Sequence, residues 1–306
     1  RAGGLRGPAR ADPRGPARVT LPPGAREVRR VGGGDINEAY RVTLADGTRA
    51  FVKTRADPAR GEYAAEAAGL RWLAQPGALR TPRVLEAHER YLALEWIDAG
   101  EAGGARGLDD AGAEELGRGL ARTHLAGAAC FGGAGGADAR FGSLALPNEP
   151  AADWPSFYAQ RRLLPLARIA RERGALDAGA VAAVERVCER LPELVGPAEA
   201  PARLHGDLWS GNVMVDAHAR PWLIDPCAYG GHREVDLAML RLFGAPCASS
   251  VGRERVFAAY EELAPLADGW RERVELFQLL PLLVHALLFG GGYAHAAARV
   301  AARYAR

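Results

Sequence analysis

The stretch Leu204-His205-Gly206-Asp207-Leu208-Trp209-Ser210-Gly211-Asn212 runs directly into the apolar segment Val213-Met214-Val215. A second apolar segment, Trp222-Leu223-Ile224, ends in Asp225, thirteen residues after Asn212. Two short apolar runs of this kind are typical of paired strands. Asp207 and Asn212 would then lie on the loop that enters the first strand, and Asp225 at the end of its partner. The spacing therefore predicts that three polar side chains converge on one group.

The same spacing resembles the active-site layout of protein kinases. The segment from His205 to Asn212 is similar to the H-R-D-x-x-x-x-N catalytic loop, with glycine in place of arginine. Asp225-Pro226 stands where those enzymes carry the Asp of D-F-G. The alternative is an ordinary hairpin in which Asp and Asn are turn residues. We favour the kinase-like layout because residues further upstream occur in the order that it requires.

Lys53 is the single lysine among the 39 Lys and Arg residues of the chain. The abundance of Arg, Ala and Gly indicates a coding bias that removes lysine wherever only a solvated positive charge is needed. Retention of Lys53 indicates a position that requires a compact ammonium on a flexible stem, which a planar guanidinium cannot imitate. The alternative is the chance survival of a surface lysine.

Residues 25–98 are predicted to form a small lobe with an antiparallel sheet and one helix. A glycine-rich turn with Gly33, Gly34 and Asp35 separates the first two strands, and its backbone N–H groups can approach phosphate oxygens. It is not a Walker A motif, because no Gly-Lys-Ser/Thr follows it. The expected strands are Val28–Val31, Ala39–Leu44, Arg49–Thr54, Arg83–Ala87 and Tyr91–Trp96, and the expected helix is Ala59–Ala74.

Beyond a Gly- and Ala-rich connector near residue 98, residues 99–306 are predicted to be mainly helical. We therefore expect an α+β fold with two lobes, like that of protein kinases: the small N-lobe and a larger C-lobe. Residues 1–24, rich in Arg, Pro, Gly and Ala, are expected to be a disordered leader without the apolar core of a signal peptide. The expected helices are Asp109–Ala126, Trp154–Arg173, Ala178–Leu191, Arg253–Leu263 and Asp268–Phe289.

Composition argues against several classes of protein. The formal charge is +2 and the arginines are spread along the chain, so no nucleic-acid partner is expected. The most apolar segment, Val274–Phe289, is interrupted by polar residues and proline, which indicates a buried helix and no membrane partner. The four cysteines form no C-x-x-C pair, which favours free thiols and a reducing, cytoplasmic setting.

Several longer stretches resemble signatures of the fructosamine (ketosamine) kinase family, whose members are related to aminoglycoside phosphotransferases within the protein-kinase-like superfamily. The stretch from Tyr229 to Met239 is the most diagnostic, because aminoglycoside and choline kinases share the catalytic loop but not this whole stretch. The matching stretches are Gly32 to Tyr40, Phe51-Val52-Lys53, Glu66 to Leu70, His205 to Asn212, Ile224-Asp225-Pro226, Tyr229 to Met239 and Leu288 to Tyr293.

The resemblance implies an ATP-dependent kinase that uses Mg²⁺ and phosphorylates the 3-hydroxyl of ketosamines, either small molecules or glycated protein lysines. Asp207 would accept the proton of the attacking hydroxyl, and Asn212 and Asp225 would bind magnesium. The nucleotide would be bound by Gly33, Gly34, Asp35, Lys53, Glu66, Glu95, Trp96 and Ile97. We prefer Glu66 over Glu62 as the partner of Lys53, although the two carboxylates lie one helical turn apart.

Other residues leave two interpretations open. Trp209 either stacks on the acceptor sugar or packs in the fold, and His232 and Glu234 either face the acceptor or form structural ion pairs. His124 and His205 are expected to be structural, and Asp236 is expected to anchor the catalytic loop. Cys227, where a small residue is usual, and the missing Gln before Pro147 leave the preferred substrate open. The competing functions are another small-molecule kinase, acting on an aminoglycoside or choline, and a non-catalytic pseudokinase.

Overall fold

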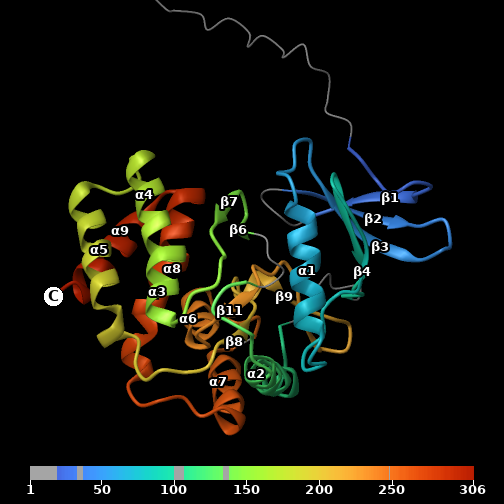
Figure 1. Ribbon diagram of the computed structural model, residues 1–306. Helices are drawn as coiled ribbons and strands as arrows, with labels where there is room; N and C mark the ends of the chain where they lie inside the picture. The colour runs from blue at the N-terminus through green and yellow to red at the C-terminus, as the bar shows by residue number, and fades with distance from the viewer. Residues whose placement is uncertain (1–18, 33–36, 100–106, 134–137, 248) are drawn as a thin grey trace, which may run out of the picture.

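The computed structural model describes residues 19–32, 37–99, 107–133, 138–247 and 249–306, and its two lobes lie side by side (Figure 1). A sheet with one helix forms the N-lobe, and in the described residues the C-lobe consists of helices and three two-stranded sheets. The predicted α+β, bilobal architecture is confirmed. Of the expected leader, residues 1–18 lie outside the described residues, whereas Leu21 packs against the apolar core of the small sheet.

The N-lobe sheet is antiparallel, with five strands in the order β1-β2-β3-β5-β4. Side chains of β5 alternate between its two faces: Tyr91 and Ala93 pack with Val52 on one side, and Leu92 and Leu94 pack under α1 on the other. Because β5 is buried on both faces, it holds the sheet and the helix together. The elements are β1 (Arg26–Val31), β2 (Glu38–Thr43), β3 (Arg49–Thr54), α1 (Glu62–Ala74), β4 (Val84–His88) and β5 (Tyr91–Glu95).

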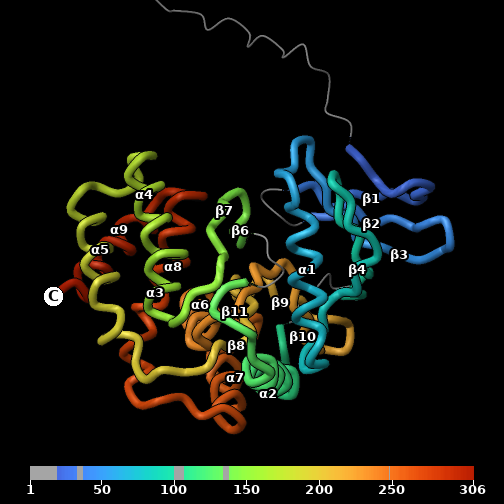
Figure 2. Tube along the Cα trace, in the orientation of Figure 1, coloured from blue at the N-terminus to red at the C-terminus, as the bar shows by residue number. Residues whose placement is uncertain are grey.

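The helices of the C-lobe surround short strands that carry the predicted catalytic segments. Strand β8 pairs with β11 and lies beside α2 (Figure 2), and β9 pairs with β10. The helices are α2 (Asp110–Leu125), α3 (Trp154–Tyr158), α4 (Leu164–Glu172), α5 (Ala178–Leu194), α6 (Glu234–Phe243), α7 (Ser250–Leu263), α8 (Trp270–Phe289) and α9 (Gly292–Tyr304). The strands are β6 (Ala139–Phe141), β7 (Leu144–Leu146), β8 (Ala202–Leu204), β9 (Val213–Val215), β10 (Pro221–Leu223) and β11 (Tyr229–Gly231).

The single helix expected at Trp154–Arg173 is interrupted by a π-helical turn at Ala159–Leu163. Pro165 has no N–H, so it cannot bond the carbonyl of Arg161 four residues earlier. The side chain of Arg162 supplies the missing donor, with Nη1 at 2.9 Å from the oxygen of Arg161. The change of helical winding therefore follows from one proline and a buried arginine beside it.

Helix α8 contains the apolar segment Val274–Phe289, as expected, and is buried along most of its length. Within the described ranges, every helix is either too short or too polar to cross a membrane. Helix α9 was not predicted. It starts at a glycine without a side-chain cap and its apolar face consists mainly of alanine, so no capping residue and only a weak apolar pattern mark it in the sequence.

Candidate active site

A cleft of about 1090 Å³ lies between the lobes, and most of the predicted site residues line it. Residues from the sheet, from α1 and from the loops around β9 and β10 all contribute to its walls. Gly33, Gly34 and Asp35 lie outside the described residues. The predicted residues that line the cleft are Lys53, Glu66, Glu95, Trp96, Ile97, Asp207, Trp209, Asn212 and Asp225.

Lys53, on β3, is a buried cation between two carboxylates. Its Nζ lies 2.5 Å from Glu66 Oε2 and 3.0 Å from Asp225 Oδ1. Burial lowers the pKa of Lys53, but the charges of Asp225 and Glu66 raise it more, so the pKa lies above its ordinary value and the ammonium is charged. Glu62 instead pairs with Arg55 at 2.6 Å. The alternative of a surface lysine is wrong, because Lys53 is only 7% exposed.

Asp225 follows β10 and points into the cleft, with 46% of its side chain exposed. Its backbone is in the left-handed region, at φ 51°, which an Asp tolerates better than most residues. Burial raises the pKa of this carboxyl, but the neighbouring ammonium of Lys53 lowers it more, so the pKa is below its usual value. Asp225 therefore presents a negative charge to the cleft.

Asp207 and Asn212 are held together by hydrogen bonds within their loop. The amide Nδ2 of Asn212 donates to Asp207 Oδ2 and to the Asp207 carbonyl, both at 2.8 Å. Because the NH₂ group is used in this way, the carbonyl Oδ1 is the Asn212 atom that can ligate a cation. Burial raises the pKa of Asp207 to about 7 despite the hydrogen bond from Asn212. A carboxylate with that pKa is well suited to accept a proton near neutral pH.

Magnesium fits this donor set. In the described part of the chain, no group of three or more His, Cys, Asp and Glu residues forms a complete metal cage. Mg²⁺ does not need one, because it is commonly held by one or two protein oxygens together with water and the phosphates of a nucleotide. Asn212 Oδ1 and the Asp225 carboxylate are oxygen donors of the kind that Mg²⁺ prefers, and both residues line the cleft.

The catalytic loop is fixed by buried groups behind it. Asp236, on α6, accepts hydrogen bonds from the backbone N–H groups of His205 at 2.7 Å and Gly206 at 2.9 Å. His205 Nε2 donates to the carbonyl of Ile224 at 2.9 Å, which ties the loop to the strand that precedes Asp225. His124 contacts Asp236 and the hydroxyl of Tyr260 in the interior. The expected supporting positions of His124, His205 and Asp236 are therefore confirmed.

Gly206 explains why glycine replaces the arginine of the kinase motif. Its φ is +81°, and a Cβ at this position would lie 2.1 Å from the carbonyl oxygen of Cys227. Only glycine combines this backbone conformation with so close an approach. The loop that carries Asp207 is thereby packed directly against the segment that follows Asp225.

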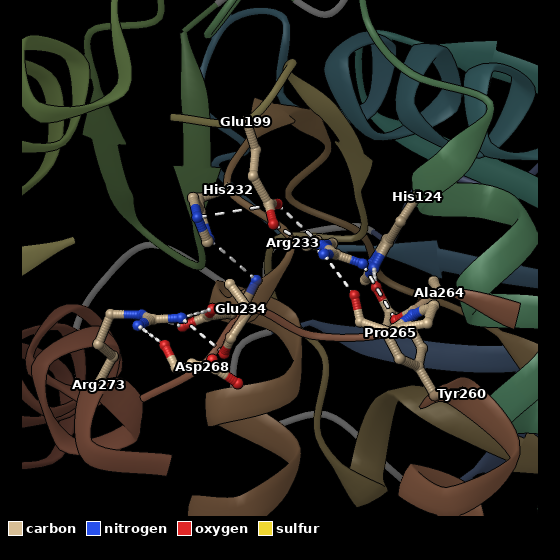
Figure 3. A network of polar contacts seen from close by, with 11 residues as sticks. His124, Glu199, His232, Arg233, Glu234, Tyr260, Ala264, Pro265, Asp268 and Arg273 are labelled. Atoms are coloured by element: carbon tan, nitrogen blue, oxygen red, sulfur yellow. Dashed lines mark hydrogen bonds and ion pairs between the residues drawn. The ribbon is translucent and has the colours of Figure 1, made fainter. Parts of the chain in front are cut away.

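His232 and Glu234 do not reach the cleft. Each is 3% exposed, within a network of polar contacts inside the C-lobe (Figure 3). Arg273 forms two hydrogen bonds with Glu234, at 2.5 and 2.9 Å, and Arg233 forms two with Glu199, at 2.7 and 2.8 Å. The polar run after Asp225 thus turns inward, because its partners come from α8 and from the segment before β8. Glu234 forms the structural ion pair of the second interpretation, whereas burial lowers the pKa of His232 to about 4, so its ring lies 3.8 Å from Glu199 as a neutral group.

Trp209 lies at the wall of the cleft and is also packed. Its ring meets Phe243 edge to face, at 6.2 Å between centroids, and covers Gly211, where a Cβ would lie 2.4 Å from the ring. His285 of α8 stacks on Phe243 at 4.4 Å. Sequence reasoning did not assign several further residues of the cleft to the site, although Cys227 is itself a departure from the family pattern and Asn148 follows another. These residues are Arg140, Phe141, Asn148, Cys227, His285 and Phe289.

Comparison with known proteins shows the family of the chain. The sequence model of the fructosamine kinase family matches residues 19–306. A probable ketoamine kinase from Synechocystis sp. is 36% identical over 274 residues, which cover 87% of this chain and 86% of that protein. The chloroplastic protein-ribulosamine 3-kinase of Arabidopsis thaliana is 33% identical over 281 residues, which cover 90% of this chain and 82% of that protein.

Solved structures agree with the same assignment. The crystal structure of a candidate fructosamine-3-kinase from Thermobifida fusca matches with a TM-score of 0.82 and 45% identity, over 92% of this chain and 93% of that chain. The ADP-bound aminoglycoside phosphotransferase APH(2'')-Ib matches with a TM-score of 0.60 and 14% identity, over 92% and 94% of the two chains, which shows a shared kinase-like fold. The chain belongs to the fructosamine kinase family.

Proposed function

We propose that this protein is an ATP-dependent kinase that transfers a phosphoryl group to the 3-hydroxyl of ketosamines. The observation that carries the proposal is the convergence of Lys53, Glu66, Asp225, Asp207 and Asn212 in one cleft of a chain of this family. Phosphoryl transfer needs positioning and neutralisation of charge more than covalent chemistry, and this set supplies both. The names of the relatives, ketoamine kinase and ribulosamine 3-kinase, support this acceptor and this hydroxyl.

Lys53 binds the α- and β-phosphates of ATP in this proposal, and Glu66 keeps its ammonium in position. Asn212 Oδ1 and Asp225 would hold magnesium, which would supply positive charge to neutralise the phosphates. The backbone from Glu95 to Ile97 binds adenine, because it lines the cleft where β5 leaves the sheet. The assignment of Gly33, Gly34 and Asp35 to the phosphates rests on the sequence pattern alone, because these residues lie outside the described part of the chain.

Asp207 accepts the proton of the attacking hydroxyl and orients the oxygen toward the γ-phosphate. Its raised pKa, about 7, makes it a stronger base than an ordinary aspartate. The Asn212 hydrogen bond fixes the carboxylate, so the acceptor meets it in one orientation. Trp209, two residues after Asp207, also lines the cleft, where its aromatic ring can stack on a sugar face.

The product accounts for a role in deglycation. A phosphate on C3 lies next to the C2 ketone, so enolisation toward C1 makes phosphate a leaving group. Its loss lets the adduct break down and frees the amine. The enzyme then has to catalyse only the transfer step, for small ketosamines or for glycated protein lysines. A reducing, cytoplasmic setting is part of the proposal and is supported by four cysteines that are all free thiols.

A phosphotransfer assay with a panel of acceptors tests the proposal. Fructose and ribulose adducts of lysine, an aminoglycoside and choline are each offered with MgATP, and ADP formation and product mass are followed. We expect phosphorylated product with the ketosamines only. Product with the aminoglycoside or choline alone would indicate the other small-molecule kinases. MgATP binding without any product would indicate the pseudokinase.

A further inference from the structure

Helix α1, which carries Glu66, is fastened at its C-terminal end by a residue of the other lobe. The carbonyl of Trp72 accepts the backbone N–H of Gln75 at 3.2 Å and, like any carbonyl oxygen, has a second lone pair for another donor. Arg203 Nη1 donates to the carbonyl of Trp72, in the last turn of α1, and to Gln75 Oε1 at 2.9 Å. Arg203 belongs to β8 in the C-lobe, so these hydrogen bonds join the two lobes.

The guanidinium of Arg203 is well matched to this place. It lies over the ring of Trp72, with Cζ 4.5 Å from the ring centroid, and its Nε donates to the carbonyl of Gly127 at 3.3 Å. A cation is favoured at the negative end of a helix dipole, and a planar guanidinium can stack and donate at the same time. All the hydrogen-bond acceptors of Arg203 among the described residues are uncharged oxygens.

The strand that holds Arg203 leads straight into the catalytic loop. His205 and Asp207 follow it, and Arg203 lies opposite Gly230 in the pair β8 and β11. The middle of α1 is also close to the C-lobe, because a Cβ on Gly69 would lie 3.3 Å from Pro226 and Ala228. The helix that carries Glu66 therefore rests on the two segments that carry the catalytic aspartates.

We propose that Arg203 is a positioning residue for the nucleotide site. It fixes the end of α1 to the strand that enters the catalytic loop, and so keeps Glu66 paired with Lys53. The Lys53–Glu66 pair is sensitive to such a shift, because its atoms are 2.5 Å apart and both side chains are buried. With α1 held from the C-lobe, the ammonium of Lys53 stays at the proposed phosphate site. This inference rests on the proposed nucleotide site.

The test is a double-mutant cycle on the binding of MgATP, measured by titration calorimetry without an acceptor. Arg203→Ala is expected to weaken MgATP binding about tenfold, which corresponds to ~1.4 kcal/mol. In a Glu66→Gln background the same change should weaken binding by less than about twofold, because the two residues act through one contact. An equal loss in both backgrounds, or no loss in either, would overturn the proposal. Because no ketosamine is present, failure of the proposed acceptor leaves this test intact.

Arg190 provides a matched control. From α5 it donates Nη1 to the carbonyl of Tyr304 at 2.9 Å, at the C-terminal end of α9, and neither residue lines the cleft. Arg190→Ala should lower the melting temperature and leave MgATP affinity unchanged. Equal weakening of MgATP binding by Arg190→Ala and Arg203→Ala would mean general destabilisation and would overturn the proposal.

A milder variant covers the possibility that Arg203→Ala does not fold. Arg203→Lys keeps the charge, but its ammonium cannot stack as a plane or span the same set of oxygens. It should weaken MgATP binding by an intermediate factor, again only while Glu66 is present. Wild-type affinity in Arg203→Lys, with wild-type folding, would show that the fork of donors is not needed and would contradict the proposal.

Discussion

Two buried ion pairs, each between a basic side chain and a glutamate, lie in different parts of this molecule. Lys53 and Glu66 meet at the cleft, with 8% and 13% of their side chains exposed, and Asp225 adds a second carboxylate to the same ammonium. Arg273 and Glu234 meet inside the C-lobe, with 9% and 3% exposed, through two parallel hydrogen bonds. Lys53 therefore contacts two carboxylates from different parts of the fold, whereas Arg273 pairs with the single carboxylate of Glu234.

The difference shows why burial alone does not identify a functional charge. The guanidinium of Arg273 also donates to the carbonyl of Asp268, so its donors are taken up by the fold. The ammonium of Lys53 is a point charge on a flexible stem, which can turn from a carboxylate to a phosphate. We therefore assign the cleft pair to chemistry and the interior pair to support, and the following variants test that division.

Asp207→Asn should have the largest effect on catalysis. The change keeps the size of the side chain but removes the base, so turnover is expected to fall by about 10²- to 10⁴-fold. MgATP affinity should change little. Asp225→Asn should act differently, by weakening the magnesium–nucleotide complex, and raising magnesium should partly restore its rate. Rescue of the Asp207 variant by magnesium would mean that the two roles have been exchanged.

Lys53→Arg should be the next most harmful change, with turnover lowered by about 10²-fold although the charge is kept. The guanidinium is too broad to occupy the point between Glu66 and Asp225. Steady-state kinetics at saturating MgATP measures the loss, and the melting temperature shows whether the fold is kept. Near-normal turnover would disprove the argument drawn from the single lysine.

The pH dependence of kcat/KM should report on Asp207. The carboxylate is the active form and its pKa is raised to about 7, so the rate should fall as pH decreases below that value. The expected loss is about tenfold per pH unit well below the pKa. Asp207→Asn should lose this acidic limb, while Lys53→Arg should keep it. A limb near the ordinary pKa of Asp in the wild type would argue against Asp207 as the base.

Arg273→Lys should have the smallest effect on turnover. The new ammonium keeps the charge but loses one of two charged hydrogen bonds to Glu234, which costs about 1.5–3 kcal/mol of folding stability. Denaturant unfolding measures that cost. Turnover per folded molecule should stay within about threefold of the wild type, because the pair does not line the cleft. A loss of turnover as large as that of Lys53→Arg would contradict the assignment of the Arg273–Glu234 pair to structural support.

The residues that could be predicted from the sequence are those that local spacing controls. Asp207, Asn212 and Asp225 occupy one hairpin and the loop before it, and their order along the chain is enough to bring them together. Lys53 was conspicuous as the single lysine, and the helix register favoured Glu66. The structure places all five at the same cleft, and their chemical roles remain predictions that the variants above test.

The residues that could not be predicted depend on partners far away in the sequence. Glu234 follows the catalytic strands closely, but its contact with Arg273 is set by the packing of α6 against α8. Nothing local marks Arg203 as the cap of a helix 131 residues earlier. The start of α9 has no capping side chain. Each of these features arises from tertiary contacts, which a linear pattern does not contain.

The position of the transferred phosphate tests the central claim most directly. A fructose adduct of lysine is incubated with MgATP and the wild-type protein, and the product is examined by phosphorus–proton correlation NMR. We predict coupling of the phosphorus to the proton on C3, followed by release of free lysine as the phosphorylated adduct breaks down. Phosphate on another hydroxyl, or no transfer to this adduct while MgATP is bound, would contradict the assignment as a ketosamine 3-kinase.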